Sequence, residues 1–234
     1  MTLKLYGDLL SQPARAVVIL CLANDISYEL ILVSLVKREH KLPEFKAINP
    51  REQLPVIDDG GFILPESAAI LKYLAVSHHV PDHWYPMDLK SRARVDYLLD
   101  WYQTNIRQTQ AYILKKELYS ALWKLPRPQE AEIESAEGTM IASMEFVEDY
   151  LLKPEKGPFL LGASELSIAD VLFACEYTQT QLLPSAEQEK LLGKKPKTKK
   201  WLQTLEQSLA PYYAQAHKTF PELITKVETA RNGN

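Results

Sequence analysis

Cysteine is nearly absent from this sequence, and it has neither a long apolar run nor a large excess of charge. Cys21 and Cys175 are its only cysteines, which excludes a disulfide framework, a cysteine metal site and a Cys-x-x-Cys pair, and favours a reducing compartment. The longest nearly apolar run, 16–23, is far below the ~18–20 residues of a membrane span, and no signal-peptide cleavage site follows it. A net charge of -3 argues against a nucleic-acid role. We therefore expect a cytoplasmic protein with no membrane or nucleic-acid partner.

The first third of the chain has the pattern of an α/β domain. Residues 3–6 and 28–33 have the content of strands, and 54–57 and 62–64 flank turn residues at 58–61. Helices are predicted from Ser11-Gln12-Pro13 to about residue 24, over 43–48, and from Pro65-Glu66-Ser67 to near residue 79. Because a β-α-β crossover lays its strands parallel and a hairpin does not, this order predicts a thioredoxin-like domain with a mixed four-stranded sheet.

The rest of the chain has the pattern of an all-α domain. A proline-rich linker at 80–86 is followed by apolar residues at helical spacing over 98–113, 140–151 and 168–182, by a helix at 198–209 and by shorter pieces to about 230. Ser167 and Asp170 have the spacing of a capping box. We predict a domain at 1–79, a linker at 80–86 and an all-helical domain at 87–234.

Ser11 is the sharpest candidate for chemistry, because it lies where the first strand passes to the first helix. Its alternative role is a plain helix N-cap. No Gly-x-Ser-x-Gly motif surrounds it, so we do not expect an acyl-transfer nucleophile. A thiol needs about 2 kcal/mol of stabilisation to be half-ionised at pH 7, and a hydrogen bond to a charged group contributes roughly 1.5–3 kcal/mol. One serine hydroxyl is thus enough to hold a bound thiolate.

Two further stretches suit a small peptide with a free acid group. Pro55 cannot donate to a sheet, which leaves the backbone of Leu54 to pair with an outside chain. Glu66 and Ser67 either merely start a helix or bind the ammonium and carboxylate of an amino-acid head. His40 and Lys41 lie in a charged loop that is either solvated or binds a second carboxylate.

Two arginines and the histidines complete the candidates. Arg15 lies one turn after Ser11, and we expect it to form a structural ion pair. Arg107, on the helix expected to begin the second domain, either adds positive potential near a thiolate or is a solvated or interface residue. The histidines at 78, 79 and 83 lack ligand spacing and companion acids, so no metal is expected.

The sequence resembles a cytosolic glutathione transferase, and most closely the theta class. The resemblance spans nearly the whole chain. Its motifs are Leu5-Tyr6, Leu10-Ser11-Gln12-Pro13-Ala14-Arg15-Ala16-Val17, Phe45-Lys46-Ala47-Ile48-Asn49-Pro50, Leu54-Pro55-Val56, Glu66-Ser67-Ala68-Ala69-Ile70, His83-Trp84-Tyr85-Pro86 and Ser167-Ile168-Ala169-Asp170.

The resemblance implies a homodimeric detoxification enzyme that uses glutathione as co-substrate, with no other cofactor. It assigns Ser11 to the glutathione thiolate, Leu54 to the cysteinyl backbone beside a cis Pro55, and Glu66 and Ser67 to the γ-glutamyl end. It also places His40, Lys41 and Gln53 toward the glycyl carboxylate. It places Tyr102, Ile106 and Tyr112 in the electrophile pocket. Gln53 departs from the lysine often found there, and 220–234 match no class-specific lid.

Three functional interpretations follow. The first is an enzyme that joins glutathione to an electrophile, or reduces a hydroperoxide to an alcohol with formation of glutathione disulfide. The second is a non-catalytic binding or adaptor module on the same fold. The third, thiol oxidoreduction through Cys21 or Cys175, is disfavoured because no cysteine lies near Ser11. The electrophile is left open.

Overall fold

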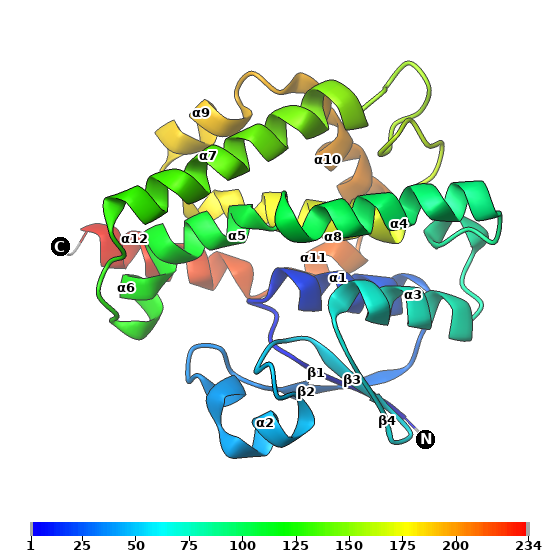
Figure 1. The fold of residues 1–234 in the computed structure, drawn as a ribbon, viewed down its shortest axis with the longest axis horizontal. Helices are drawn as coiled ribbons and strands as arrows, with labels where there is room; N and C mark the ends of the chain where they lie inside the picture. Colours follow the sequence, from blue (N-terminus) through cyan, green and yellow to red (C-terminus); the bar gives the residue numbers. More distant parts are fainter. Residues whose placement is uncertain (1, 233–234) are drawn as a thin grey trace.

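The computed structural model describes residues 2–232. Figure 1 shows a sheet with α2 on one face and α1 and α3 on the other, between the sheet and the helical part of the chain. The larger of two apolar core clusters extends through both parts, from Leu3 and Leu5 in the sheet to Phe220 and Val227 near the C-terminus. None of the helices within 2–232 has the length and apolar content needed to cross a membrane.

The sheet has the predicted mixed topology. Its strands are β1 (Leu3–Gly7), β2 (Tyr28–Leu32), β3 (Val56–Asp59) and β4 (Phe62–Pro65), in the order β2-β1-β3-β4. β1 is parallel to β2, whereas the β1–β3 and β3–β4 pairs are antiparallel. The thioredoxin-like prediction is therefore confirmed. The hairpin turn is shorter than predicted, because Gly60 and Gly61 alone, at φ 61° and 97°, connect the strands.

The helices of the sheet domain are α1 (Gln12–Ala23), α2 (Pro43–Ile48) and α3 (Ser67–Ser77), with a short 3-10 turn, η1 (Glu39–Lys41), before α2. The start of α3 differs from the prediction. Pro65 ends β4 instead of opening the helix, and Glu66 is the N-cap at φ 71°, in the left-handed region. The chain therefore turns sharply at Glu66, and Ser67 is the first helical residue.

The second part is all helix, as predicted. Its elements are η2 (Asp82–Trp84), α4 (Leu89–Thr104), α5 (Gln108–Ile113), η3 (Leu114–Leu118), α6 (Tyr119–Trp123), α7 (Glu130–Phe146), η4 (Val147–Leu151), α8 (Ile168–Thr178), η5 (Gln179–Leu182), α9 (Ser185–Leu192), α10 (Pro196–Ser208), α11 (Tyr212–Ala216) and α12 (Phe220–Asn232). One placement needs correction. Arg107 is not on the helix that begins this part, because α4 ends at Thr104 and Arg107 lies in the turn before α5.

The two parts meet where α1 packs against α8. The start of α8 is held by the predicted capping box, in which Asp170 Oδ2 accepts hydrogen bonds from the backbone N (2.9 Å) and the Oγ (2.8 Å) of Ser167. Domain limits at 79 and 87 stay a prediction. The packing of α1 on α8 brings the start of the first helix close to the helical part, and the pocket forms there.

Candidate functional site

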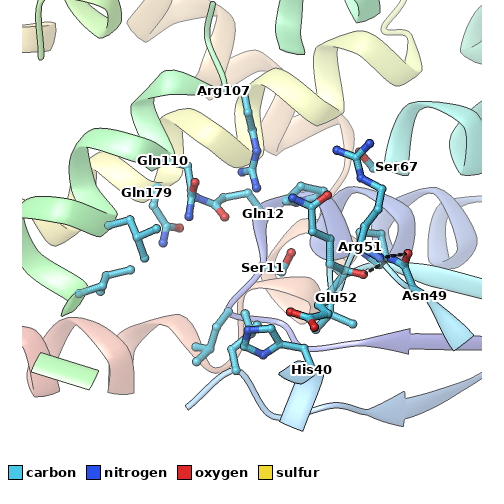
Figure 2. Close-up of a pocket in the computed structure, with 18 of the residues that line it drawn as sticks. Ser11, Gln12, His40, Asn49, Arg51, Glu52, Ser67, Arg107, Gln110 and Gln179 are labelled. Carbon is cyan, nitrogen blue, oxygen red and sulfur yellow. Dashed lines mark hydrogen bonds between the residues drawn. The ribbon is translucent and has the colours of Figure 1, made fainter. Parts of the chain in front are cut away.

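A pocket of about 510 Å³ lies between the sheet domain and the helical part. Its sheet-domain side is formed by the starts of α1 and α3, the loop before β3 and η1, and its other side by α4 to α6, η5 and α12. Figure 2 shows Arg107 extending from the helical side toward Gln12 and Ser11, with His40 on the other side of Ser11. The lining residues are Leu10–Pro13, Leu35, His40, Lys41, Asn49, Arg51–Pro55, Glu66, Ser67, Tyr102, Gln103, Arg107, Gln110, Leu114, Leu118, Leu122, Trp123, Gln179 and Leu223.

Ser11 occupies the N-cap position of α1, yet its side chain makes no capping hydrogen bond. The loop before it is held by Asp8, whose Oδ1 accepts from Leu10 N (2.9 Å), whose Oδ2 accepts from Leu35 N (2.8 Å) and whose backbone O accepts from Ser11 N (2.9 Å). The hydroxyl of Ser11 is thus placed at the pocket and keeps its proton available. This geometry does not favour a plain N-cap.

The backbone of Leu54 lies outside the sheet, because β3 begins only at Val56. The Leu54–Pro55 peptide bond is cis. The side-chain Nδ2 of Asn49 donates to the carbonyl of Gln53 at 2.8 Å and so anchors this loop, while no backbone hydrogen bond of Leu54 occurs within the described residues. An extended backbone could pair with Leu54 here.

Glu66 and Ser67 lie together at the rim of the same pocket. The first amides of α3 have no partner within the helix, so they offer donors to an anion beside the hydroxyl of Ser67. Arg51, which sequence reasoning missed, lies 3.5 Å from Glu66 through its Nε. Basic and acidic groups are thus both present where an amino-acid head would need them.

His40 and Lys41 also line the pocket, and they differ in charge and in their hydrogen-bond partners. Lys41 Nζ lies 2.7 Å from Glu52 Oε2, and this hydrogen bond lowers the pKa of Glu52. Burial, together with the charges of Lys41 and Arg38, lowers the pKa of His40. His40 Nδ1 is buried and finds no partner within the described residues. His40 is therefore a neutral imidazole at neutral pH.

Only one of the three residues predicted for the electrophile end lines the pocket. Tyr102 does, whereas Ile106 and Tyr112 do not. The break in the helix after Thr104 turns Ile106 fully into the core. The hydroxyl of Tyr112 bonds to Glu187 instead, at 3.1 Å. The apolar part of the helical wall is formed largely by leucines, which no sequence signal distinguished from core leucines.

Arg107 and Tyr102 share one buried carboxylate. Glu176 Oε1 accepts from Arg107 Nη1 at 2.6 Å and from the Tyr102 hydroxyl at 2.5 Å. Burial and the charge of Glu176 raise the pKa of Tyr102 well above its ordinary value. Burial opposes the charge of Arg107, but Glu176 outweighs it and the pKa of Arg107 is raised. Arg107 is therefore a permanent cation at the pocket wall.

Arg15 does not form the predicted ion pair. Its side chain is fully buried and donates to the carbonyls of Leu9 (3.0 Å) and Cys175 (3.2 Å) and to Gln179 Oε1 (2.9 Å). These bonds join the loop before α1 to the end of α8. Arg15 therefore holds the two sides of the pocket together through neutral acceptors.

Several lining residues were missed by sequence reasoning. Gln12 stands next to Ser11, is buried, and has an Nε2 without a partner within the described residues. Trp123 Nε1 donates to the carbonyl of Leu35 at 2.9 Å and ties the helical wall to the sheet domain. Adjacency to Ser11 could have indicated Gln12. Nothing in the sequence pairs residues as distant as Leu35 and Trp123.

The two cysteines lie in the core, away from this pocket. Burial raises the pKa of Cys21 and that of Cys175 to about 12. Both are therefore thiols, not thiolates, at neutral pH. Within residues 2–232 no group of three or more His, Cys, Asp or Glu side chains is arranged to hold a metal ion.

Comparisons with known sequences identify relatives over nearly the whole chain. A family model described as "Glutathione S-transferase, N-terminal domain" matches residues 1–76. Glutathione S-transferase T1 from Arabidopsis thaliana is 40% identical over 230 residues, which is 97% of this chain and 91% of that protein. Glutathione S-transferase theta-2 from Mus musculus is 35% identical over 225 residues, which is 96% of this chain and 89% of that protein.

Solved structures of the same kind match the fold. A human theta-class glutathione transferase in complex with the glutathione conjugate of 1-menaphthyl sulfate superposes with a TM-score of 0.86 at 35% identity, covering 98% of this chain and 91% of that one. Human glutathione-S-transferase T1-1 in its apo form gives a TM-score of 0.83 at 33% identity, with 96% and 90% covered. The likeness thus includes both the sheet domain and the helical part.

Proposed function

Because this chain belongs to the glutathione S-transferase family, in its theta class, and is thereby a transferase enzyme, we propose that it ionises the thiol of bound glutathione with a hydrogen bond from Ser11 and joins the sulfur to an electrophile. The single observation that supports this most is the Ser11 hydroxyl, which lies at the pocket and caps nothing. Its relatives support glutathione conjugation as the reaction class.

The chemistry needs only a modest shift of the thiol pKa. A hydrogen bond from Ser11 to the thiolate contributes roughly 1.5–3 kcal/mol, which corresponds to about 1–2 pKa units. The N-terminus of α1, at which Ser11 is placed, adds about 0.3–1 kcal/mol for a bound anion. The thiolate then attacks the electrophile, the new carbon–sulfur bond takes the sulfur electron pair, and the leaving group departs with the pair of the broken bond.

We place the rest of glutathione by the groups that the pocket offers. Leu54 pairs with the cysteinyl backbone beside cis Pro55, and Glu66 and Ser67 bind the γ-glutamyl ammonium and carboxylate. His40 and Gln53 bind the glycyl carboxylate, and Lys41, which shares its charge with Glu52, adds long-range attraction there.

The electrophile then occupies the helical side of the pocket. Tyr102 and Arg107 form its polar part, and the leucines at 114, 118, 122 and 223 form its apolar part. An apolar body beside a polar or anionic leaving group fits such a wall. Ile106 and Tyr112 act here only through the packing behind that wall.

The test is ultraviolet difference absorbance of the glutathione complex. We expect a thiolate band in the wild type at pH 7 that is lost in Ser11→Ala and partly retained in Ser11→Thr, which keeps a hydroxyl. A wild-type band that persists unchanged in Ser11→Ala would falsify the role of Ser11. Absence of any band in a wild type that still binds glutathione would favour the non-catalytic binding module.

The same thiolate supports our second proposed activity, reduction of organic hydroperoxides. Attack of the thiolate on the terminal peroxide oxygen breaks the O–O bond and leaves a sulfenic acid on glutathione, and the departing alkoxide takes a proton from water to become the alcohol. A second glutathione converts the sulfenic acid to the disulfide and water. The apolar leucine wall favours this activity because it can hold the organic part of the peroxide. Both activities should fall together in Ser11→Ala.

We further propose that the enzyme works as a cytoplasmic homodimer. Large apolar side chains are exposed at Phe62 on β4, at Val76 on α3, at Met87 just before α4, and at Leu89 and Tyr97 on α4. Figure 1 places these elements at one end of the molecule. Exposed apolar side chains of this size are what an association between two copies would cover. Light scattering on the purified protein would give its mass in solution.

A further inference from the structure

Arg107 lies in a turn between two helices, where the backbone alone does not fix the direction of a long side chain. It belongs to the turn between α4 and α5, after Asn105 at φ -119° and ψ -93°. Its side chain is 28% exposed and lines the pocket. A long side chain on such a turn has several rotamers open to it unless another group selects one.

Glu176 is the group that selects the rotamer. It is fully buried on α8, the helix that packs against α1. Its Oε1 accepts from both Arg107 and Tyr102, whereas its Oε2 is buried and has no partner within the described residues. Only Nη1 of Arg107 is used in this pair, so other N–H donors of the guanidinium remain for the pocket (Figure 2).

We propose that Glu176 is a positioning residue for the transferase reaction: it fixes the Arg107 guanidinium beside the thiol site and limits the positive charge that Arg107 presents there. The inference rests on the proposed function and deepens it. Glu176 does not touch the substrates, and it acts only through Arg107.

The charges around the pair support both halves of this role. From α1, Arg15 donates to the carbonyl of Cys175, which precedes Glu176 in α8, and from α4 the Tyr102 hydroxyl donates to Glu176. Burial raises the pKa of Glu176, while Arg107, Tyr102 and Arg15 oppose that rise. With a guanidinium 2.6 Å away, Glu176 is a carboxylate at neutral pH, and it cancels part of the field of Arg107.

Removing only the charge should therefore strengthen the positive potential at the thiol. Glu176→Gln keeps the size and the acceptor oxygen for Arg107 and Tyr102. We expect it to lower the thiol pKa of bound glutathione by about one unit, because Arg107 is then unopposed. Arg107→Gln should raise the same pKa. In an Arg107→Gln background, Glu176→Gln should have no effect, because a buried carboxylate without its cation takes up a proton.

Removing the side chain should affect position instead. Glu176→Ala releases Arg107, and we expect kcat to fall about tenfold with the glutathione KM unchanged. Circular dichroism and thermal unfolding would check that both variants fold. Glu117→Gln is the matched control: Glu117 is a buried carboxylate paired with Arg231 at 2.9 Å, outside the residues that line the pocket, and its substitution should leave the thiol pKa unchanged.

The experiment is an ultraviolet titration of the glutathione complex from pH 5 to 9 for the wild type and these variants, with kcat and KM for one electrophile. A thiolate band that is present in the wild type but titrates identically in Glu176→Gln overturns this inference and leaves the role of Ser11 intact. The inference is also overturned if Glu176→Gln shifts the thiol pKa by the same amount in the wild type and in the Arg107→Gln background. A wild type without a thiolate band overturns the proposed function and this inference together.

Discussion

Ser11 and Ser167 are the N-cap residues of α1 and α8, and their hydroxyl groups are used in opposite ways. Ser167 at the start of α8 donates to Asp170 at 2.8 Å, whereas Ser11 at the start of α1 makes no capping bond. Both residues are 7% exposed. Burial and position in the helix therefore do not separate them. What separates them is whether the hydroxyl has a partner inside the protein.

The comparison shows how a fold reserves a polar group for a ligand. An N-cap bond typically contributes about 1 kcal/mol, which α1 forgoes at Ser11. Asp8 holds the Ser11 loop through Leu10 and Leu35, and Arg15 holds it through Leu9. The loop is thus kept rigid by other groups, and the hydroxyl is left for the thiol.

The largest effect on stability is expected at Asp170, which accepts the hydrogen bond of the Ser167 hydroxyl. Asp170 Oδ1 also accepts from Leu160 N (2.9 Å) and Trp201 Nε1 (3.0 Å), so Asp170→Ala leaves several buried donors without acceptors. We expect the free energy of unfolding to fall by about 3–5 kcal/mol. Urea unfolding would measure it. Asp170→Asn, which keeps one acceptor oxygen, should lose less, and a loss below about 1 kcal/mol in Asp170→Ala contradicts the structural role.

His217 lies outside the candidate functional site, and its burial should make the stability of the protein depend on pH. Burial, with the charge of Arg15, lowers the pKa of His217 to about 3, and its buried Nε2 has no partner within the described residues. Because the folded pKa lies below the unfolded value of about 6.5, stability is full above pH 6.5 and falls as the pH drops toward 3. We expect a loss of about 2 kcal/mol at pH 5 from this group.

The measurement for His217 is urea unfolding at several pH values from 5 to 8, in the wild type and in His217→Gln. The variant lacks the titrating ring, so its stability should fall less between pH 6.5 and 5. Acidic residues elsewhere contribute equally to both proteins. Parallel curves for the two proteins would mean that the pKa of His217 is the same in the folded and unfolded states, which contradicts this prediction.

A smaller effect on stability is expected when the hydroxyl group of either serine is removed. Ser167→Ala should cost about 1 kcal/mol of stability and leave kcat/KM per folded molecule unchanged, because the hydroxyl only donates to Asp170. Ser11→Ala should change stability by less than about 0.5 kcal/mol, because no intramolecular bond is lost. Thermal unfolding and conjugation kinetics on both variants would check this. Similar stability losses in both would place Ser11 among the ordinary caps.

The sheet domain and the places of Ser11, Leu54 and Ser67 at the pocket were predictable because their signals are local, although Gln12 and Arg51 were missed in the same half. Turn residues, proline positions and strand content set the order of elements, and the crossover rule then brings Ser11, Leu54 and Ser67 to one side of the sheet. The gap before β3 follows from Pro55 alone. In the sheet domain, the neighbouring residues in the sequence therefore determine where a residue lies in the fold.

The helical half was not predictable in the same way, since its pocket depends on contacts between distant residues. Tyr102 and Ile106 both fit a helical apolar pattern, but the break after Thr104 turns only Tyr102 toward the pocket. Glu176 stands inside an apolar run, and its partner Arg107 is 69 residues away. Arg15 was predicted to seek an acid, yet backbone carbonyls can satisfy a buried guanidinium equally.

The smallest effect is expected from the cysteines. Each thiol is buried in the core with a pKa raised to about 12, so neither supplies a thiolate at neutral pH. Cys21→Ala with Cys175→Ala should retain glutathione conjugation within about twofold per folded molecule, although the lost packing will lower the unfolding temperature. Activity should be assayed well below that temperature. If instead conjugation disappeared while glutathione binding persisted, the reactive sulfur would belong to the protein, and the free hydroxyl of Ser11 would need another explanation.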